Sequence, residues 1–600
     1  MMQLLSGNEA IALGAYHSGV RVATAYPGTP STEILESVAT FSDIYAEWST
    51  NEKVAMEVAL GAAYAGVRAM VSMKHVGLNV ASDPFMAAST TGVSTGLVVV
   101  VADDPGMHSS QNEQDSRHYA RLAKIPVLEP ADSQEAYDFM AHAFTLSEEF
   151  DTPVMVRSTT RISHSKSVVR PNRDRLAADM PAHFQNCIAK YVMMPVFARQ
   201  RHPAMEERLV KLADYAETFY LNQVFAGESR LGIVTGGVAY HYAREVFPKA
   251  SVLKLGMSYP LPANLIRSFA AQVDRLVVIE ELDPFLEDLI RSLGIRVEGK
   301  DFIPRVGELN PDIVARAGRG SGLFDNNHND ETTPLPPEPM PNLPPRAPLL
   351  CPGCPHTGVF YILSSLGQRS RLPGAKEKPP AKSKLVITGD IGCYTLGAYP
   401  PLSAMDTCAC MGASIGKALG MEKAGLGRKV VAVIGDSTFL HSGITSLVDA
   451  VYNDGRLTVV ILDNGTTAMT GHQHHPGTGV SAQGRDTNAV SLEGTVRGLG
   501  INDVTVVSAF DIKGIRTALK SALAADELSV VIVRGPCAVR IKRTTPRVID
   551  PEKCNNCGTC RLLGCPAIRS EAGRLYIEPL LCVGESCGIC EQVCPRGAIH

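Results

Sequence analysis

Long apolar runs are missing from this 600-residue chain, and so is any long run of one charge. A membrane-spanning helix needs about 20 mostly apolar residues, so the sequence predicts no membrane span. The 57 basic and 61 acidic residues give a net charge of −4, which argues against attraction to nucleic acid or to a membrane surface. The first residues include Glu9 and no basic stretch, so we expect no signal peptide. A cytoplasmic protein with small-molecule and protein partners is expected.

A disulfide framework and a short-period internal repeat are also missing. The 15 cysteines are odd in number and gather at spacings typical of metal sites, which fits a reducing compartment. With 45% hydrophobic residues, a chain of this length can bury several cores, and we expect about four domains.

Short apolar runs alternate with helical stretches over three regions, and this pattern predicts a multidomain α/β protein built on parallel sheets. We expect α/β domains at 1–185, 186–324 and 349–545. Between Pro334 and Pro348, eight of fifteen residues are proline, so residues 325–348 are expected to form an extended linker. The basic stretch from Arg369 to Lys384 is expected to be a surface loop. Residues 546–600 form a separate cysteine-rich region.

Eight cysteines fall in the last 47 residues, in two groups that each end in Cys-Pro. A two-cluster ferredoxin binds each 4Fe-4S cluster through three closely spaced thiolates and one distant Cys-Pro thiolate. This rule predicts a ferredoxin-like domain with one cluster on Cys554, Cys557, Cys560 and Cys594, and a second on Cys582, Cys587, Cys590 and Cys565. The gaps before Cys565 and Cys587 are longer than in the bacterial ferredoxin pattern. Structural zinc is the alternative, although zinc prefers two separated pairs and some histidine.

Polar residues follow two expected strands of the third region. KVVAVI runs into Gly435-Asp436-Ser437, and LTVVIL ends in Asp463-Asn464-Gly465-Thr466. Ligands of parallel sheets bind at the carboxyl ends of the strands, and a carboxylate with an amide suits a hard cation such as Mg²⁺ bridging a diphosphate. Met411-Gly412-Ala413-Ser414, at an expected helix start, offers backbone N–H groups to the diphosphate. Both strand-end motifs also occur as ordinary turns.

Together, GDS and DN resemble the G-D-G and N-N motif of thiamine diphosphate enzymes. The resemblance implies that Mg²⁺ is bound by the Asp436 and Asn464 side chains and the Thr466 carbonyl. The other residues that it places around the cofactor in this domain are Gly435, Ser437, Met411 and Gly412.

The N-terminal region carries three further strings: YPGTPST from Tyr26, NEKVAMEV from Asn51 and SMKHVGLN from Ser72. They resemble the pyrimidine domain of 2-oxoacid:ferredoxin oxidoreductases, most of all its indolepyruvate branch. The resemblance implies that Glu52 is the glutamate that activates the aminopyrimidine ring, with Tyr26, Pro27 and Thr29 also at the cofactor. Two alternatives are that Glu52 closes a capping box with Ser49 and that Glu57 is the activating residue.

Four other cysteines, Cys351, Cys354, Cys393 and Cys537, resemble the set that holds a proximal 4Fe-4S cluster in this family. Buried free thiols are the alternative. Among the histidines of the motif loops, His75 and His472 are the candidates to face substrate. Arg117 is a candidate to bind a substrate carboxylate through its guanidinium, and a surface ion pair is the competing interpretation.

The resemblance covers the whole chain and implies the large subunit of an α2β2 enzyme. In that family a small β subunit carries a further domain with a glycine-rich motif, which this sequence lacks. The implied reaction is oxidative decarboxylation of arylpyruvates, such as indole-3-pyruvate, to aryl-acetyl-coenzyme A with reduction of ferredoxin. Pyruvate, 2-oxoglutarate or branched 2-oxoacids are alternative substrates. A non-catalytic iron-sulfur electron-transfer subunit is the other alternative, and serine in place of glycine in GDS favours it.

Overall fold

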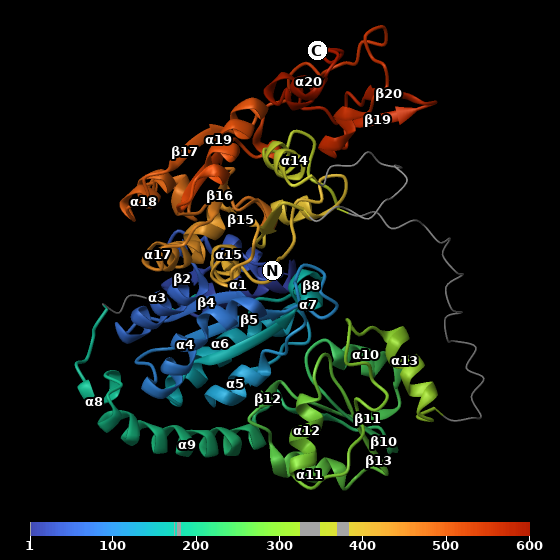
Figure 1. The fold of residues 1–600 in the computed structure, drawn as a ribbon. Helices are drawn as coiled ribbons and strands as arrows, with labels where there is room; N and C mark the ends of the chain where they lie inside the picture. Colours follow the sequence, from blue (N-terminus) through green and yellow to red (C-terminus); the bar gives the residue numbers. More distant parts are fainter. Residues whose placement is uncertain (1, 173, 177–181, 325–347, 369–382) are drawn as a thin grey trace. The chain divides into compact units, whose positions relative to one another are not determined.

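The computed structural model (Figure 1) describes all residues except 1, 173, 177–181, 325–347 and 369–382. The expected linker and most of the expected basic loop therefore lie outside the described residues. The chain divides into two compact units, Met1–Pro337 with Ala482–Gly484, and Glu338–Ser481 with Arg485–His600. Within the described ranges, no helix is long and apolar enough to cross a membrane.

The first unit begins with a seven-stranded sheet in the order β12-β6-β7-β5-β4-β2-β3, whose strands run parallel except β12. β5 is buried along its whole length, as expected for a central parallel strand. The sequence prediction of parallel strands here is confirmed. The strands are β2 (Val22–Ala25), β3 (Tyr45–Trp48), β4 (Ala69–Lys74), β5 (Leu97–Asp103), β6 (Val127–Leu128), β7 (Val154–Thr159) and β12 (Met257–Tyr259).

Helices cover both faces of this sheet, because alternate strand residues point to opposite sides. Helices α3, α4 and α5 pack on Val99 and Val101, whereas α1, α2 and α6 pack on Val98 and Val100. Their bounds are α1 (Gly7–His17), α2 (Thr32–Val38), α3 (Glu52–Tyr64), α4 (His75–Thr91), α5 (Arg117–Ala123) and α6 (Ser133–Glu149), followed by α7 (Thr160–His164). A small antiparallel pair joins β1 (Gln3–Ser6) to β8 (Lys166–Val169).

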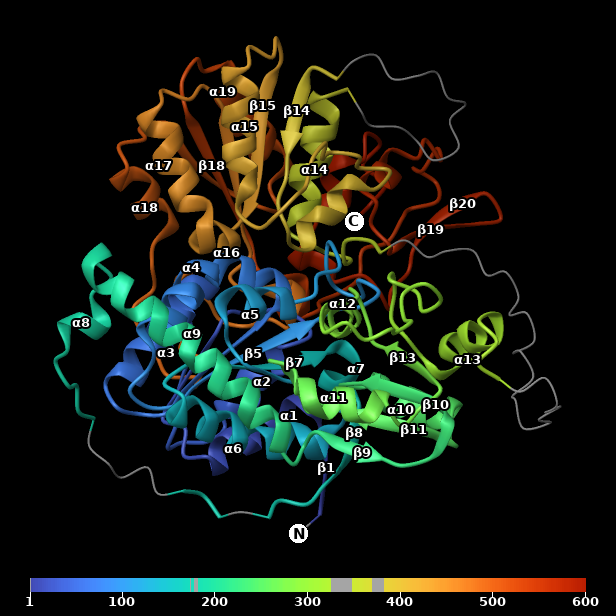
Figure 2. The same ribbon diagram turned by 90° about the horizontal axis from the view of Figure 1, so that it is seen from below.

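The middle region is built on a second sheet, in the order β13-β10-β11-β9. The long helix α9 packs against both α4 and α11, and β12 joins the first sheet, so the two regions share one core (Figure 2). The strands are β9 (Gln223–Phe225), β10 (Glu228–Thr235), β11 (Ala250–Lys254) and β13 (Arg275–Ile279). The helices are α8 (Ile188–Tyr191), α9 (Pro195–Thr218), α10 (Ala239–Val246), α11 (Ala263–Ala270), α12 (Phe285–Ser292) and α13 (Pro311–Gly320).

The second unit contains a five-stranded parallel sheet in the order β14-β15-β16-β18-β17. β15 and β16 are the expected strands KVVAVI and LTVVIL, and β17 is an edge strand that was not expected. The strands are β14 (Leu385–Thr388), β15 (Lys429–Gly435), β16 (Thr458–Asp463), β17 (Val504–Ser508) and β18 (Ser529–Arg534). Helices α14 (His356–Leu366) and α19 (Ile512–Ala524) cover one face, and α15 (Ala413–Lys423), α17 (Ile444–Tyr452) and α18 (Leu492–Gly498) the other.

The cysteine-rich tail has little regular structure. A hairpin of β19 (Ile568–Glu571) and β20 (Arg574–Ile577) and the short helix α20 (Ile589–Val593) are its main elements. Its small core combines five cysteines with eight aliphatic residues. So small an apolar core is typical of domains that depend on bound metal or cross-links for stability.

Candidate functional site

Asp436 lies at the carboxyl end of β15, where it begins the one-turn helix α16 (Asp436–Thr438). Its Oδ1 accepts the N–H of Ser437 at 2.7 Å, and its Oδ2 accepts the N–H groups of Asn464 at 3.1 Å and Gly465 at 2.8 Å. Burial works to raise the pKa of Asp436, but the His475 ring and these amides outweigh burial and lower that pKa. The carboxylate is therefore held ionised and fixed in orientation.

Asn464 follows β16, the next strand in the sheet. Its Oδ1 accepts the N–H of Thr466 at 3.1 Å, and its Nδ2 lies 3.4 Å from Nε2 of His356. The three predicted metal ligands, Asp436, Asn464 and Thr466, thus meet at one corner of the sheet. Carboxylate, amide and carbonyl oxygens are the ligands that Mg²⁺ takes in proteins, so this donor set fits the cation.

Ser437 is where the motif departs from G-D-G, since a serine takes the place of the second glycine. Its Oγ accepts a hydrogen bond from the Thr467 hydroxyl at 2.9 Å, and both side chains are buried. The extra side chain is therefore accommodated within the protein, bonded to Thr467. The substitution gives no support to a vestigial cofactor site.

The expected helix start at Met411-Gly412 is also observed, because α15 begins at Ala413 with Gly412 as its N-cap. The amides of Ala413 and Ser414, however, donate to Asp390 at 3.0 and 2.9 Å. Those two amides are therefore engaged by Asp390, and the placement of Met411 and Gly412 at the diphosphate stays a prediction. Asp390 was missed by sequence reasoning, although it follows β14 as Asp436 follows β15.

Glu52 is the first residue of α3 in the other unit, and it is buried. The helix is capped by Asn51, whose side chain accepts the N–H of Val54 at 2.9 Å, while the Ser49 hydroxyl donates to Glu47 at 2.7 Å. The interpretation of Glu52 as the partner of Ser49 in a capping box is therefore wrong. Glu57, the rival, is exposed and paired with Lys53.

The N-terminal strings meet at the same edge of the first sheet, because β2, β3 and β4 run parallel into them. Glu52 lies so close to Gly77 that a Cβ atom added to Gly77 would lie 2.7 Å from Oε1 of Glu52. His75 is buried, and its Nε2 lies 3.2 Å from the Asn112 carbonyl. Tyr26 and Pro27 are buried, and the Thr29 carbonyl accepts the Ser109 hydroxyl.

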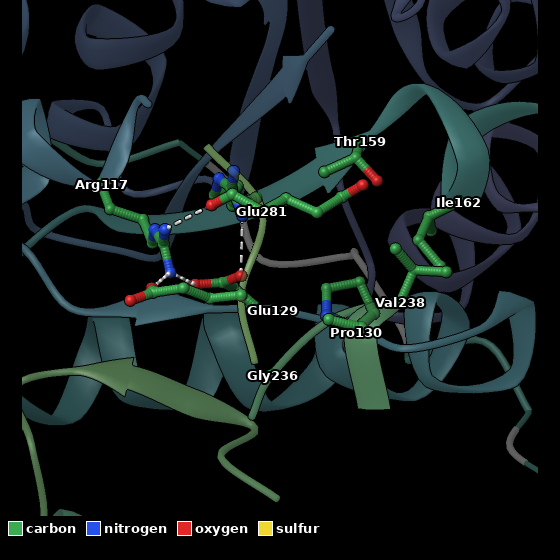
Figure 3. A pocket seen from close by; sticks show the side chains of 12 residues that line it. Arg117, Glu129, Pro130, Thr159, Ile162, Gly236, Val238 and Glu281 are labelled. Carbon is green, nitrogen blue, oxygen red and sulfur yellow. Dashed lines mark hydrogen bonds and ion pairs between the residues drawn. The ribbon is translucent and has the colours of Figure 1, made fainter. Parts of the chain in front are cut away.

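Arg117 does not match either prediction made for it. It is fully buried, its Nε donates to Asp115 at 2.8 Å, and its Nη1 donates to Glu280 of the middle region at 2.9 Å. Figure 3 shows the Arg117 side chain among further acidic residues, with Glu129 and Glu281 beside it. Arg117 is therefore neither a surface residue nor open to a substrate carboxylate.

Arg157 extends this buried charge network, donating to Asp103 at 2.6 Å and to Glu129 at 2.8 Å. Burial raises the pKa of Glu280 and of Glu281 to about 7. The network joins side chains of the first sheet to those that follow β13, and it lines a cavity between the two regions of the first unit (Figure 3). It therefore fixes the middle region against the first sheet.

Replacing Arg117 with methionine is expected to lower the free energy of unfolding of the first unit by about 3–5 kcal/mol, because buried carboxylates are left unpaired. Urea denaturation followed by circular dichroism measures the change. Arg161→Met is the matched control, because Arg161 pairs with Glu308 across the same two regions but is about half exposed, and such pairs contribute about 0–1 kcal/mol. Equal effects of the two substitutions would contradict this account.

The eight tail cysteines line two separate cavities. One is lined by Cys554, Cys557, Cys560 and Cys594, and the other by Cys565, Cys582, Cys587 and Cys590. These are the two sets predicted from the spacing, including the exchange of the Cys-Pro cysteines between groups. Burial raises the pKa of Cys590 to about 12 and that of Cys560 to about 11, so these thiols stay protonated until a metal displaces the proton.

The loop Cys351-Pro-Gly-Cys354 forms one wall of the second tail cavity. Gly353 has a φ of +75°, and a Cβ there would lie 2.3 Å from a methyl carbon of Val583. The loop thus approaches the tail through a position that only glycine suits. Burial raises the pKa of the Cys354 thiol, with smaller effects from neighbouring Cys351, Cys393 and Cys537. His472, the second candidate histidine, lies 3.9 Å from the sulfur of Cys537.

Comparison with known proteins agrees with this arrangement. Residues 390–533 match the family "Thiamine pyrophosphate enzyme, C-terminal TPP binding domain", and residues 13–207 match "Pyruvate flavodoxin/ferredoxin oxidoreductase, thiamine diP-bdg". Indolepyruvate oxidoreductase subunit IorA of Methanothermobacter thermautotrophicus is 43% identical over 99% of this chain and 96% of its own length. The chain belongs to the IorA family. The IorA subunit of Archaeoglobus fulgidus is 40% identical over 99% of this chain and 97% of its own.

Membership in the IorA family makes this chain an oxidoreductase subunit with two thiamine diphosphate-binding domains. A more distant relative, 2-oxoglutarate synthase subunit KorA of M. thermautotrophicus, is 26% identical and covers 50% of this chain and 94% of its own length. Sequence reasoning on the IorA motifs missed three buried residues at the metal corner and helix start: Asp390, His356 and His475. His356 follows the Cys-Pro-Gly-Cys-Pro motif directly, and His475 lies three positions after the candidate His472.

Proposed function

We propose that this chain is the large subunit of an enzyme that oxidatively decarboxylates arylpyruvates, such as indole-3-pyruvate, to aryl-acetyl-coenzyme A and reduces ferredoxin. The observation that carries the proposal is the near-full-length identity of 43% to an indolepyruvate oxidoreductase subunit. The corner formed by Asp436, Asn464 and Thr466 supports it, because the donor set that this chemistry needs is present and ordered.

Thiamine diphosphate, when bound, supplies the nucleophilic carbon and the electron sink for decarboxylation. Asp436, Asn464 and the Thr466 carbonyl would hold the Mg²⁺ that binds its diphosphate, with Gly435, Ser437, Met411 and Gly412 around it. Glu52 would hold a proton against the pyrimidine ring, since its carboxyl is buried at the end of a parallel sheet. Tyr26, Pro27 and Thr29 line the same edge.

Electrons would leave through iron-sulfur clusters held by the tail cysteines, and the lining of the two cavities supports two 4Fe-4S clusters. Cys351, Cys354, Cys393 and Cys537 would hold a third, beside which His472 lies. A small β subunit would complete an α2β2 assembly. Coenzyme A would act as the co-substrate, and ferredoxin as the electron acceptor.

The test is an anaerobic assay of the reconstituted subunits, in which coenzyme A-dependent reduction of a viologen dye is followed with four acids in parallel. Indolepyruvate and phenylpyruvate are expected to give kcat/KM values at least tenfold above those of pyruvate and 2-oxoglutarate. A pocket that fits an aromatic side chain gains enough binding energy from it to account for a difference of about tenfold. Reduction with pyruvate or 2-oxoglutarate alone would assign this enzyme the substrate of another branch of the 2-oxoacid:ferredoxin oxidoreductases. Loaded clusters without reduction by any acid would favour a pure electron-transfer subunit.

A further inference from the structure

Two buried histidines adjoin the two side chains assigned to Mg²⁺. His475 lies with Nε2 at 3.3 Å from Oδ2 of Asp436, and His356 lies with Nε2 at 3.4 Å from Nδ2 of Asn464. We propose that both are positioning residues for the metal ligands: His475 turns its Nε2–H group toward the Asp436 carboxylate, and His356 accepts a hydrogen bond from Asn464. The inference rests on the proposed function, because it concerns ligands of the same metal site.

The tautomer of His475 follows from its other ring nitrogen. The N–H of Gly477 donates to Nδ1 at 3.2 Å, so Nδ1 carries no proton and the neutral ring carries it on Nε2. That proton faces Asp436, and the described residues offer Nε2 no aligned hydrogen bond elsewhere. A buried N–H group without an acceptor is costly, so the ring is held toward the carboxylate. The contact is too poorly aligned for a full hydrogen bond, so the N–H dipole of the neutral ring orients the carboxylate by its attraction to the negative charge.

His356 differs from His475 in that its Nε2 atom acts as a hydrogen-bond acceptor. The N–H of Thr466 donates to Oδ1 of Asn464, which identifies the oxygen end of the amide and turns the NH₂ end toward His356. Nε2 of His356 must then accept, which requires a neutral ring with its proton on Nδ1.

The two contacts matter because a cation binds oxygen atoms. Both Asp436 and Asn464 can also adopt an orientation in which their oxygen atoms point away from the cation. If the Asn464 amide were flipped, its NH₂ group would replace the oxygen, and that group cannot bind a cation. If Asp436 rotated, its oxygens would leave the amides of Asn464 and Gly465. Partners behind the ligands of a metal site orient those ligands and typically change metal affinity 10- to 100-fold when removed.

His356 also connects this corner to the cysteines. Its backbone N–H bonds to the Cys354 thiol and works to lower the pKa of that thiol, while its ring holds Asn464. One residue therefore contacts both the proposed proximal cluster set and a metal ligand. Loss of the ring should disturb the metal without removing the backbone contact to Cys354.

The experiment measures the Mg²⁺ affinity of the reconstituted enzyme at saturating thiamine diphosphate, by titration calorimetry, and repeats it with Mn²⁺ by electron paramagnetic resonance. His475→Leu and His356→Leu are each expected to weaken Mg²⁺ binding about 10- to 100-fold. His475→Gln and His356→Gln should restore most of the affinity, because a glutamine amide offers a donor or an acceptor near the position of Nε2. If a leucine variant does not fold, the phenylalanine variant replaces it.

His474→Leu is the matched control, because His474 lies in the same loop and pairs with Thr478 instead; its Mg²⁺ affinity should be unchanged. Folded leucine variants with wild-type affinity would overturn the proposal. Glutamine variants as weak as leucine variants would also overturn it, since packing alone would then explain the loss. Unchanged binding in Asp436→Asn would instead overturn the metal site, and with it the proposed function.

Discussion

Replacing Glu52 with glutamine is expected to lower kcat for the arylpyruvate by about 10²- to 10⁴-fold, the range of a lost proton-transfer group. The amide has nearly the same shape but cannot hold the exchangeable proton of the carboxyl. Glu52 is buried against Gly77 at the start of α3, so the substitution should leave thiamine diphosphate binding within a few fold. Pre-steady-state dye reduction, together with cofactor titration, separates the two effects.

Glu57→Gln is the matched control, because Glu57 lies on the same helix but is exposed and paired with Lys53. Its kcat should stay within about twofold of wild type, since an exposed ion pair contributes little. Equal activity of Glu52→Gln and wild type would exclude Glu52 as the activating residue. A loss in Glu57→Gln instead would transfer the role to that residue.

Replacing the two Cys-Pro cysteines one at a time is expected to remove two different clusters. Cys594→Ser should abolish the cluster of Cys554, Cys557 and Cys560, because Cys594 lines their cavity. Cys565→Ser should abolish the cluster of Cys582, Cys587 and Cys590. Electron paramagnetic resonance of the reduced protein should lose a different signal in each variant, and dye reduction should fall to background in both.

Cys187→Ser is the control for these two substitutions, since Cys187 is exposed and lines neither cavity. It should keep the full iron content and both signals. Loss of the same signal from Cys594→Ser and Cys565→Ser would show that the cysteines are not exchanged between the groups. Zinc in place of iron in anaerobically prepared protein would show that the tail cysteines bind structural zinc and not iron-sulfur clusters.

The parallel strands were predictable because buried parallel strands are continuous runs of Val and Ile, as in β5 and β16. The same logic placed Asp436 and Asn464 together, since neighbouring parallel strands end at one edge. The edge strand β17 was not predicted, because its half-exposed residues lack the apolar run of a central strand. Asp390 follows the short strand β14 and was predictable by the rule that found Asp436.

The ion pairs of Arg117 and the contacts of the two positioning histidines could not be predicted from the sequence, for a different reason. Arg117 pairs with Glu280, 163 positions away, and His356 contacts Asn464, 108 positions away. Local pattern carries no signal for such pairs, because they depend on how separate elements pack. An arginine is expected to be exposed by default, and only the burial of Arg117 at the start of α5, between two regions, reveals a structural ion pair.

The loop from Cys351 to Cys354 closes one side of the cavity lined by Cys565, Cys582, Cys587 and Cys590, and Gly353 fits against Val583 without room for a side chain. The enclosure of these four cysteines is therefore shared between the tail and the domain that carries the loop. We expect a tail produced without that domain to leave its four cysteines more open to solvent.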